Sequence, residues 1–130
     1  MQTRLLLAEA LFWLHVLIVA FWYSLFFVPS GMWPWGDKIT FHFWFTIGIV
    51  FHQFAWGAMI MPWTKKYRMV CILTTFMQML RGADIADPKN YNHSFIQELF
   101  GKTGVTIPHR LTTIITLSIL TVVSIQFFWR

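Results

Sequence analysis

Two histidines lie deep inside long apolar stretches of this sequence, where an imidazole could hold a cofactor or carry a proton. His15 lies ten residues after Leu5, where the first stretch starts, and His52 lies ten residues before Pro62, where the second ends. At about 1.5 Å per helical residue, each histidine is about 15 Å from that end. If the two stretches form an antiparallel hairpin, those ends lie on the same side of a membrane. We therefore expect both imidazoles to be buried at one level, near the bilayer midplane.

Such a pair is compatible with electron transfer. His15 and His52 could ligate a b-type haem, or serve a quinone-associated protein, and Trp22 and Trp56 lie on the same helical faces as these histidines. The default interpretation is structural: the imidazoles hydrogen-bond to each other or to neighbouring helices and keep the helices in register.

The same histidines are also compatible with transport. Glu9, His15, His52 and Gln53 are ionisable or polar side chains inside apolar stretches, where such groups often mark a path for protons, ions or solutes. A small channel or transporter is therefore a further hypothesis.

Three other histidines are expected together at the opposite, non-cytoplasmic rim. His42 begins the second apolar segment, His109 begins the last one, and His93 lies in the loop between them. Imidazoles are common ligands of divalent metals, but this spacing matches no compact metal motif. Interfacial hydrogen bonding is the default, and a metal site is the alternative.

The sequence contains no nucleophile elbow, phosphate-binding loop, two-histidine zinc motif or cysteine-pair redox motif. We therefore predict no catalytic residue and favour a non-enzymatic protein. Cys71 is the single cysteine, which excludes an internal disulfide.

The composition is that of an integral membrane protein. Hydrophobic residues make up 57% of the 130 residues and charged residues only 12%, about half of the usual share in soluble domains. The net charge of +5 comes from residues that flank the apolar runs, so it predicts contact with lipid headgroups and not with nucleic acid.

The apolar runs predict an all-α fold, an antiparallel four-helix transmembrane bundle in a single domain, 1–130. The expected helices cover about 5–28, 40–62, 67–81 and 107–129. In the loop 82–106, Ser94 and Gln97 match a capping box and predict a short amphipathic helix from Phe95 to Phe100. The segment 67–81 is short for a span. If it is instead re-entrant or interfacial, the chain crosses three times and its C-terminus changes side.

The charges near the end of the second segment predict the orientation. Lys65, Lys66 and Arg68 lie in one short connection, which the positive-inside rule places in the cytoplasm. With four spans, the N-terminus and Arg130 are then both cytoplasmic. The expected location is a bacterial inner membrane.

Several motifs resemble an uncharacterised family of small bacterial multi-pass membrane proteins. The features that occur in the order of that family are His15, His42, Met61-Pro62-Trp63-Thr64, Tyr91-x-x-Ser94-Phe95-Ile96 and Arg110. The family's turn usually reads Cys-Pro-Leu-Thr and is followed by an acidic residue and an arginine. Here Met61 and Trp63 replace the cysteine and the leucine, Lys65-Lys66 follow with no acidic residue, and 65–90 looks like an insertion. The resemblance implies an architecture and no reaction.

The expected function is therefore that of a small multi-pass membrane subunit embedded in the lipid bilayer. Helices with aromatic residues on nearly every face leave much surface for contact with other helices. We expect it to form a homo-oligomer or to join a larger membrane complex.

Overall fold

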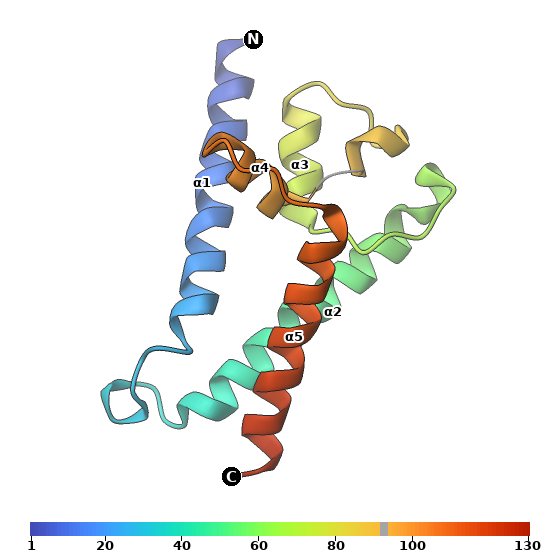
Figure 1. Cartoon of the computed structure of the whole chain (residues 1–130). Helices are drawn as coiled ribbons and strands as arrows, with labels where there is room; N and C mark the ends of the chain where they lie inside the picture. The colour runs from blue at the N-terminus through green and yellow to red at the C-terminus, as the bar shows by residue number, and fades with distance from the viewer. Residues whose placement is uncertain (92–93) are drawn as a thin grey trace.

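A computed structural model of the chain describes residues 1–91 and 94–130. The described residues form five α-helices, two short 3₁₀ helices and no strand, which confirms the predicted all-helical class (Figure 1). The α-helices are α1 (Gln2–Ser24), α2 (Lys38–Thr64), α3 (Ile72–Leu80), α4 (Phe95–Lys102) and α5 (His109–Phe128), and the 3₁₀ helices are Ser30–Met32 and Pro88–Tyr91.

Three of these helices are long and apolar enough to cross a membrane. They are α1 with 23 residues, α2 with 27 and, within α5, the 19 residues Arg110–Phe128. At about 1.5 Å per residue each reaches roughly 30 Å or more, the thickness of the hydrocarbon core. The three helices fit an integral, multi-pass membrane protein.

The four-helix transmembrane bundle is not confirmed, because the expected helix over 67–81 begins only at Ile72. The resulting α3 has nine residues, which corresponds to about 14 Å, roughly half of the hydrocarbon thickness.

The missing turns of α3 are replaced by a segment that folds back along α2. Lys65 ends α2 in the left-handed conformation, with φ of 57°, and reverses the chain. The backbone N–H of Val70 then donates to the carbonyl of Gln53, near the middle of α2 (3.4 Å). Helix α3 therefore starts beside the middle of α2.

This close return depends on Gly57. A Cβ atom built on Gly57 would lie 1.9 Å from the carbonyl oxygen of Arg68, so no larger residue fits without moving the returning segment. Gly48, two and a half turns earlier on the same helix, has no such neighbour within 4 Å.

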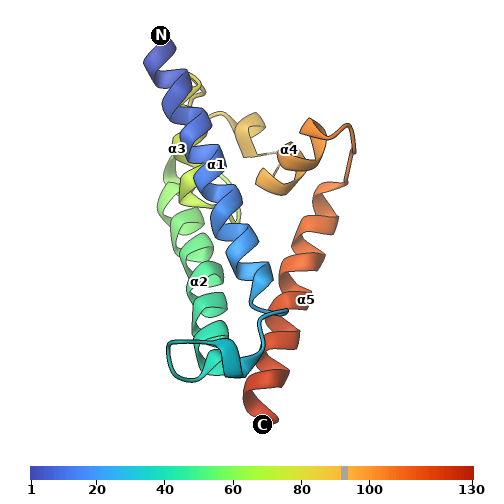
Figure 2. The ribbon, with the colours of Figure 1, turned by 90° about the vertical axis from the view of Figure 1, so that its left-hand side faces the viewer.

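The long helices pair unevenly. Helix α1 packs mainly against α3, and α2 mainly against α5, while α1 and α2 contact each other only over a short length. Near the loop that joins α1 to α2, a cluster of Trp22, Phe43, Ile119 and Val123 joins α1, α2 and α5. From there α1 diverges from α2 (Figure 1) and from α5 (Figure 2), and the two termini lie at opposite ends.

The predicted short amphipathic helix is present as α4, which lies between α1 and the start of α5 (Figure 2). Its capping box is formed as expected, with Ser94 and Gln97 bonding reciprocally. Phe95 packs with Ala8, Phe12 and Met77 in a cluster that joins α1, α3 and α4. Helix α4 thus covers the diverging ends of the longer helices.

Candidate functional site

His15 is buried, as the sequence predicted, but its contact comes from an unexpected element. Its ring stacks on that of Phe95 of α4, with centroids 3.8 Å apart and an angle of 15° between the planes. One face of the imidazole is therefore covered by α4.

His52 and Gln53 lie near the middle of α2 and are half-buried, whereas the sequence predicted a buried His52. His52 is close enough to His15 to interact with it electrostatically. Within residues 1–91 and 94–130, neither the His52 imidazole nor the Gln53 amide has a hydrogen-bond partner. Two polar groups at mid-span are thus left open to an additional partner. Ligation of haem b by His15 and His52 stays a prediction.

The two tryptophans on the histidine faces join helices through hydrogen bonds. The indole of Trp22 donates to the hydroxyl of Thr46 (2.9 Å), and that of Trp56 donates to the hydroxyl of Thr75 (3.0 Å). The first bond links α1 to α2 in a buried position, and the second links α2 to α3. Both aromatic side chains therefore have a structural role in keeping the helices in register.

Glu9 belongs to a network of charges at the N-terminal end of the molecule. Its carboxylate lies 3.7 Å from the guanidinium of Arg81 and 3.6 Å from the ammonium of Lys102, and Arg81 also pairs with Glu98 at 2.8 Å. The hydrogen bond to Glu98 is the main reason why the pKa of Arg81 is raised. The network ties α1, the end of α3 and α4 together.

The sequence predicts a structural role for Glu9, in a pair with Arg4 or Lys66, and a transport path as the alternative. Glu9 instead pairs with Arg81 and Lys102, and neither Lys102 nor Glu98 is predicted from the sequence as part of this network. The sequence does place Glu98 and Lys102 four residues apart on the short amphipathic helix, and this spacing puts both side chains on one helical face. Glu98 forms its ion pair with Arg81, 17 positions away in the sequence, and sequence spacing does not reveal such a pair.

The three histidines proposed for a metal do not form one site in the described residues. His42 lies near the start of α2, beside the end of α5, where Phe43 stacks on Phe127 (4.1 Å). His109 begins α5, and 18 residues separate it from Phe127, which corresponds to about 27 Å of helix. His93 lies outside the described residues. Among residues 1–91 and 94–130, no group of three or more metal-binding side chains is close enough to hold an ion.

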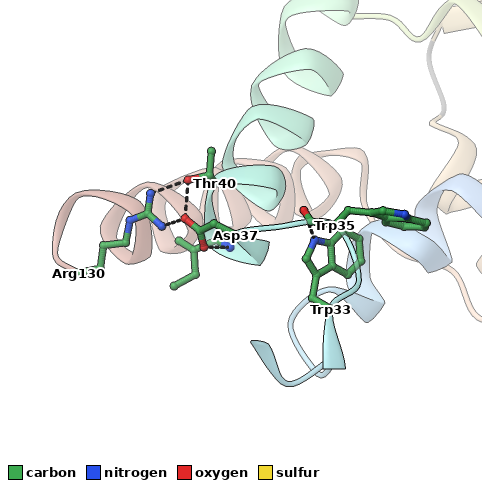
Figure 3. A network of polar contacts seen from close by, with 6 residues as sticks. Trp33, Trp35, Asp37, Thr40 and Arg130 are labelled. Carbon is green, nitrogen blue, oxygen red and sulfur yellow. Dashed lines mark hydrogen bonds and ion pairs between the residues drawn. The ribbon is translucent and has the colours of Figure 1, made fainter. Parts of the chain in front are cut away.

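The end of the molecule that holds His42 carries a second polar network (Figure 3). Asp37 caps α2 by accepting from the backbone N–H of Ile39 (3.1 Å) and from the hydroxyl of Thr40 (2.6 Å). The guanidinium of Arg130 bonds to Asp37 and to Thr40. The network therefore fastens the end of α5 to the start of α2.

His42 itself is unpaired. It is only 1% exposed, and its Nε2 atom is a buried polar atom with no hydrogen-bond partner in the described chain. Its ring contacts the edge of Phe26 at 4.6 Å. The sequence predicts interfacial hydrogen bonding for His42, with a metal site as the alternative, whereas in the described chain its Nε2 atom has no hydrogen-bond partner.

Comparisons with protein-family models, with curated proteins and with solved structures found no match for this chain.

Proposed function

We propose that the protein is a small membrane subunit, without a catalytic reaction of its own, that spans the bilayer three times and assembles laterally with other transmembrane helices. The supporting observation is the pair His52 and Gln53, which are half-buried near the middle of α2 and whose side chains form no hydrogen bond with the described residues. A polar group in hydrocarbon without a partner is costly, and a neighbouring helix that offers a donor or acceptor removes this cost.

The small share of covered helix surface agrees with lateral assembly. Only 17% of the most apolar 18-residue window is buried in α1 and in α5, and 28% in α2. Gly48 is also uncovered on α2, and a glycine on an open helical face allows another backbone to approach closely. A second copy of the chain, or a larger complex, would cover these faces.

Light scattering of the purified complex in a mild detergent tests this proposal, because it measures the protein mass without the bound detergent. Lateral self-assembly predicts an integral multiple of 15.4 kDa. Gln53→Leu should weaken the association about 3- to 20-fold, the loss of one hydrogen bond between helices. Phe51→Leu, an exposed apolar position on the same helix, is the matched control and should leave the association unchanged.

A monomer of 15.4 kDa in detergent and in lipid nanodiscs, with no stoichiometric partner from the source membrane, would refute lateral assembly.

A second candidate function is passage of protons, ions or solutes, and the segment that folds back along α2 before α3 favours it. Non-helical backbone at membrane depth is tolerated where it is buried in protein or lines a cavity, and broken helices at mid-membrane are frequent in transporters. Here α3 begins beside Gln53, on the same part of α2 as His52. Flux into liposomes that depends on pH and is lost in His52→Ala would support it, and flux unchanged in that variant would remove His52 from the path.

A further inference from the structure

The unpaired Nε2 atom of His42 requires an explanation. Buried polar atoms in folded proteins nearly always have a hydrogen-bond partner, and an exception commonly marks a bound molecule or a functional role. His42 is 99% buried with its ring against Phe26, and no atom of the described chain satisfies this nitrogen. A ligand that brings an acceptor or a donor to His42 would satisfy it.

His42 also lines a hollow of about 480 Å³ between the first turns of α2 and the last turn of α5. This volume lies within the range of ordinary ligand sites. We name it the α2–α5 hollow. The polar side chains that line it beside His42 are Ser30, Lys38, Gln126 and Arg130.

The charges of the α2–α5 hollow select an anion. Lys38 and Arg130 are the two cations among the lining residues, and because Arg130 is ion-paired with Asp37, the uncompensated positive charge is that of Lys38. The ammonium of Lys38 donates one hydrogen to the carbonyl of Val28 (2.6 Å) and keeps two others. The guanidinium of Arg130 uses two nitrogens on Asp37 and Thr40 and retains further N–H groups. The positive end of the α2 dipole lies at the same place.

The position of the hollow favours a phosphate over other anions. It lies where two apolar helices of membrane-spanning length end, beside Trp129. Tryptophans concentrate at the depth of lipid headgroups, and phosphate is the anionic group at that depth. A second hollow at this end of α2 is lined by four aromatic side chains, which offer an apolar surface for the rest of a lipid, and by Thr40 and Asp37, whose carboxylate is ion-paired with Arg130 (the aromatic residues are Trp35, Phe41, Trp44 and Phe45).

We propose that the α2–α5 hollow binds the phosphate group of an anionic phospholipid, with Lys38 and Arg130 as the cations and His42 as the buried hydrogen-bonding group. This proposal does not depend on whether the protein assembles laterally. It adds a site for a specific lipid headgroup.

The test is a thermal-unfolding titration of the purified chain in a nonionic detergent. The three probes are short-chain phosphatidylglycerol, diacylglycerol with the same acyl chains and no phosphate, and inorganic phosphate. We expect saturable stabilisation by phosphatidylglycerol and none by the diacylglycerol. Equal saturable stabilisation by inorganic phosphate would identify free phosphate as a ligand of the same site.

Single substitutions test which side chains bind the phosphate group. Lys38→Gln and Arg130→Gln should each raise the apparent Kd for phosphatidylglycerol about 5- to 10-fold, because each removes a charge-assisted hydrogen bond. Arg110→Gln is the control, since Arg110 is an exposed cation at the opposite end of α5 and should leave the Kd unchanged. His42→Phe keeps an aromatic ring and should weaken binding while the stability of the lipid-free protein stays equal or increases.

Two results would overturn the proposal. One is the absence of saturable stabilisation by either phosphate-containing probe. The other is an equal loss of binding in Arg110→Gln and Arg130→Gln, which would show that any surface cation has the same effect. Arg130 is exposed at the end of the chain, so its variant should fold even if His42→Phe does not.

Discussion

Replacing Gly57 by alanine should destabilise the protein, because the added methyl group meets the carbonyl of Arg68. The Cβ atom would lie 1.9 Å from this oxygen, and contacts of Cβ atoms in proteins essentially never fall below 3.0 Å. The returning segment would have to move by roughly 1 Å, an overpacking that costs about 1–3 kcal/mol. The bond from Val70 to Gln53, already 3.4 Å long, would be lost as well, at about 1 kcal/mol.

The same substitution at Gly48 gives the matched control. Nothing lies within 4 Å of a Cβ atom there, and alanine is preferred over glycine inside a helix by about 0.5–1 kcal/mol. Allowing for this preference in both variants, we expect a net loss of about 1–3 kcal/mol for Gly57→Ala and no loss for Gly48→Ala. The difference isolates the close approach of the returning segment.

The assay is unfolding from mixed micelles by increasing SDS, followed by tryptophan fluorescence. Eight tryptophans supply the signal, and Trp56 is adjacent to the substituted glycine. We expect a lower unfolding midpoint for Gly57→Ala only. Equal midpoints in the two variants would refute the close return of the chain along α2.

Three further predictions concern the hydrogen bond between α1 and α2, the charge network of Arg81 and the ligation of haem. Trp22→Phe should lower the free energy of unfolding by about 1 kcal/mol, and a double-mutant cycle with Thr46→Val should assign most of it to their hydrogen bond; additive effects would contradict that bond. Arg81→Gln should lower the free energy of unfolding by about 1 kcal/mol or less, and the loss should decrease with added salt because the ion pairs of Arg81 are partly exposed. The control Arg110→Gln should leave the free energy of unfolding unchanged, and equal losses in the two variants would contradict the network. The absorption spectrum of the purified protein should lack a Soret band in both redox states, and a Soret band lost in the His15 and His52 variants would instead establish haem ligation.

The sequence predicted the long helices and the short capped helix, because these depend on local patterns. The ranges 5–28, 40–62 and 107–129 correspond to α1, α2 and α5 within a few residues, and the capping box of Ser94 fixed the start of α4. Apolar length and side-chain capping act within a few turns of one segment, so they are visible without knowledge of the fold.

The return of the chain along α2 depends on a contact between two distant parts of the chain. The sequence alone therefore does not decide whether 67–81 spans the membrane or forms a shorter helix. A dozen apolar residues before Arg81 are compatible with a thin span or with a partial one. In the structure the apolar helix is short and the chain returns along α2, because Lys65 adopts a left-handed conformation and Gly57 leaves room for Arg68. Neither property is specific enough in a sequence to predict the contact, although a glycine inside an apolar helix is a signal for close backbone approach.

The candidate sites were predictable only in part, for a related reason. Depth along a helix follows from counting residues, and it correctly predicted that His15 is buried. The partner of a side chain depends on how the helices rotate and diverge, which counting does not give. His15 therefore stacks on Phe95 of α4, and His42 lies beside Lys38 and Arg130 instead of beside His109.

The number of membrane crossings is the central claim of this account, and reporters at the two ends of the chain test it most directly. Alkaline phosphatase is active only outside the cytoplasm and green fluorescent protein folds to fluoresce inside it, so each terminus can carry either reporter in a bacterial host. Three crossings by α1, α2 and α5 predict that the termini lie on opposite sides, and the positive-inside rule applied to the cations after α2 predicts a cytoplasmic N-terminus. We expect fluorescence from the N-terminal fusion and phosphatase activity from the C-terminal fusion. The same reporter active at both termini would show an even number of crossings and contradict the three crossings that we propose.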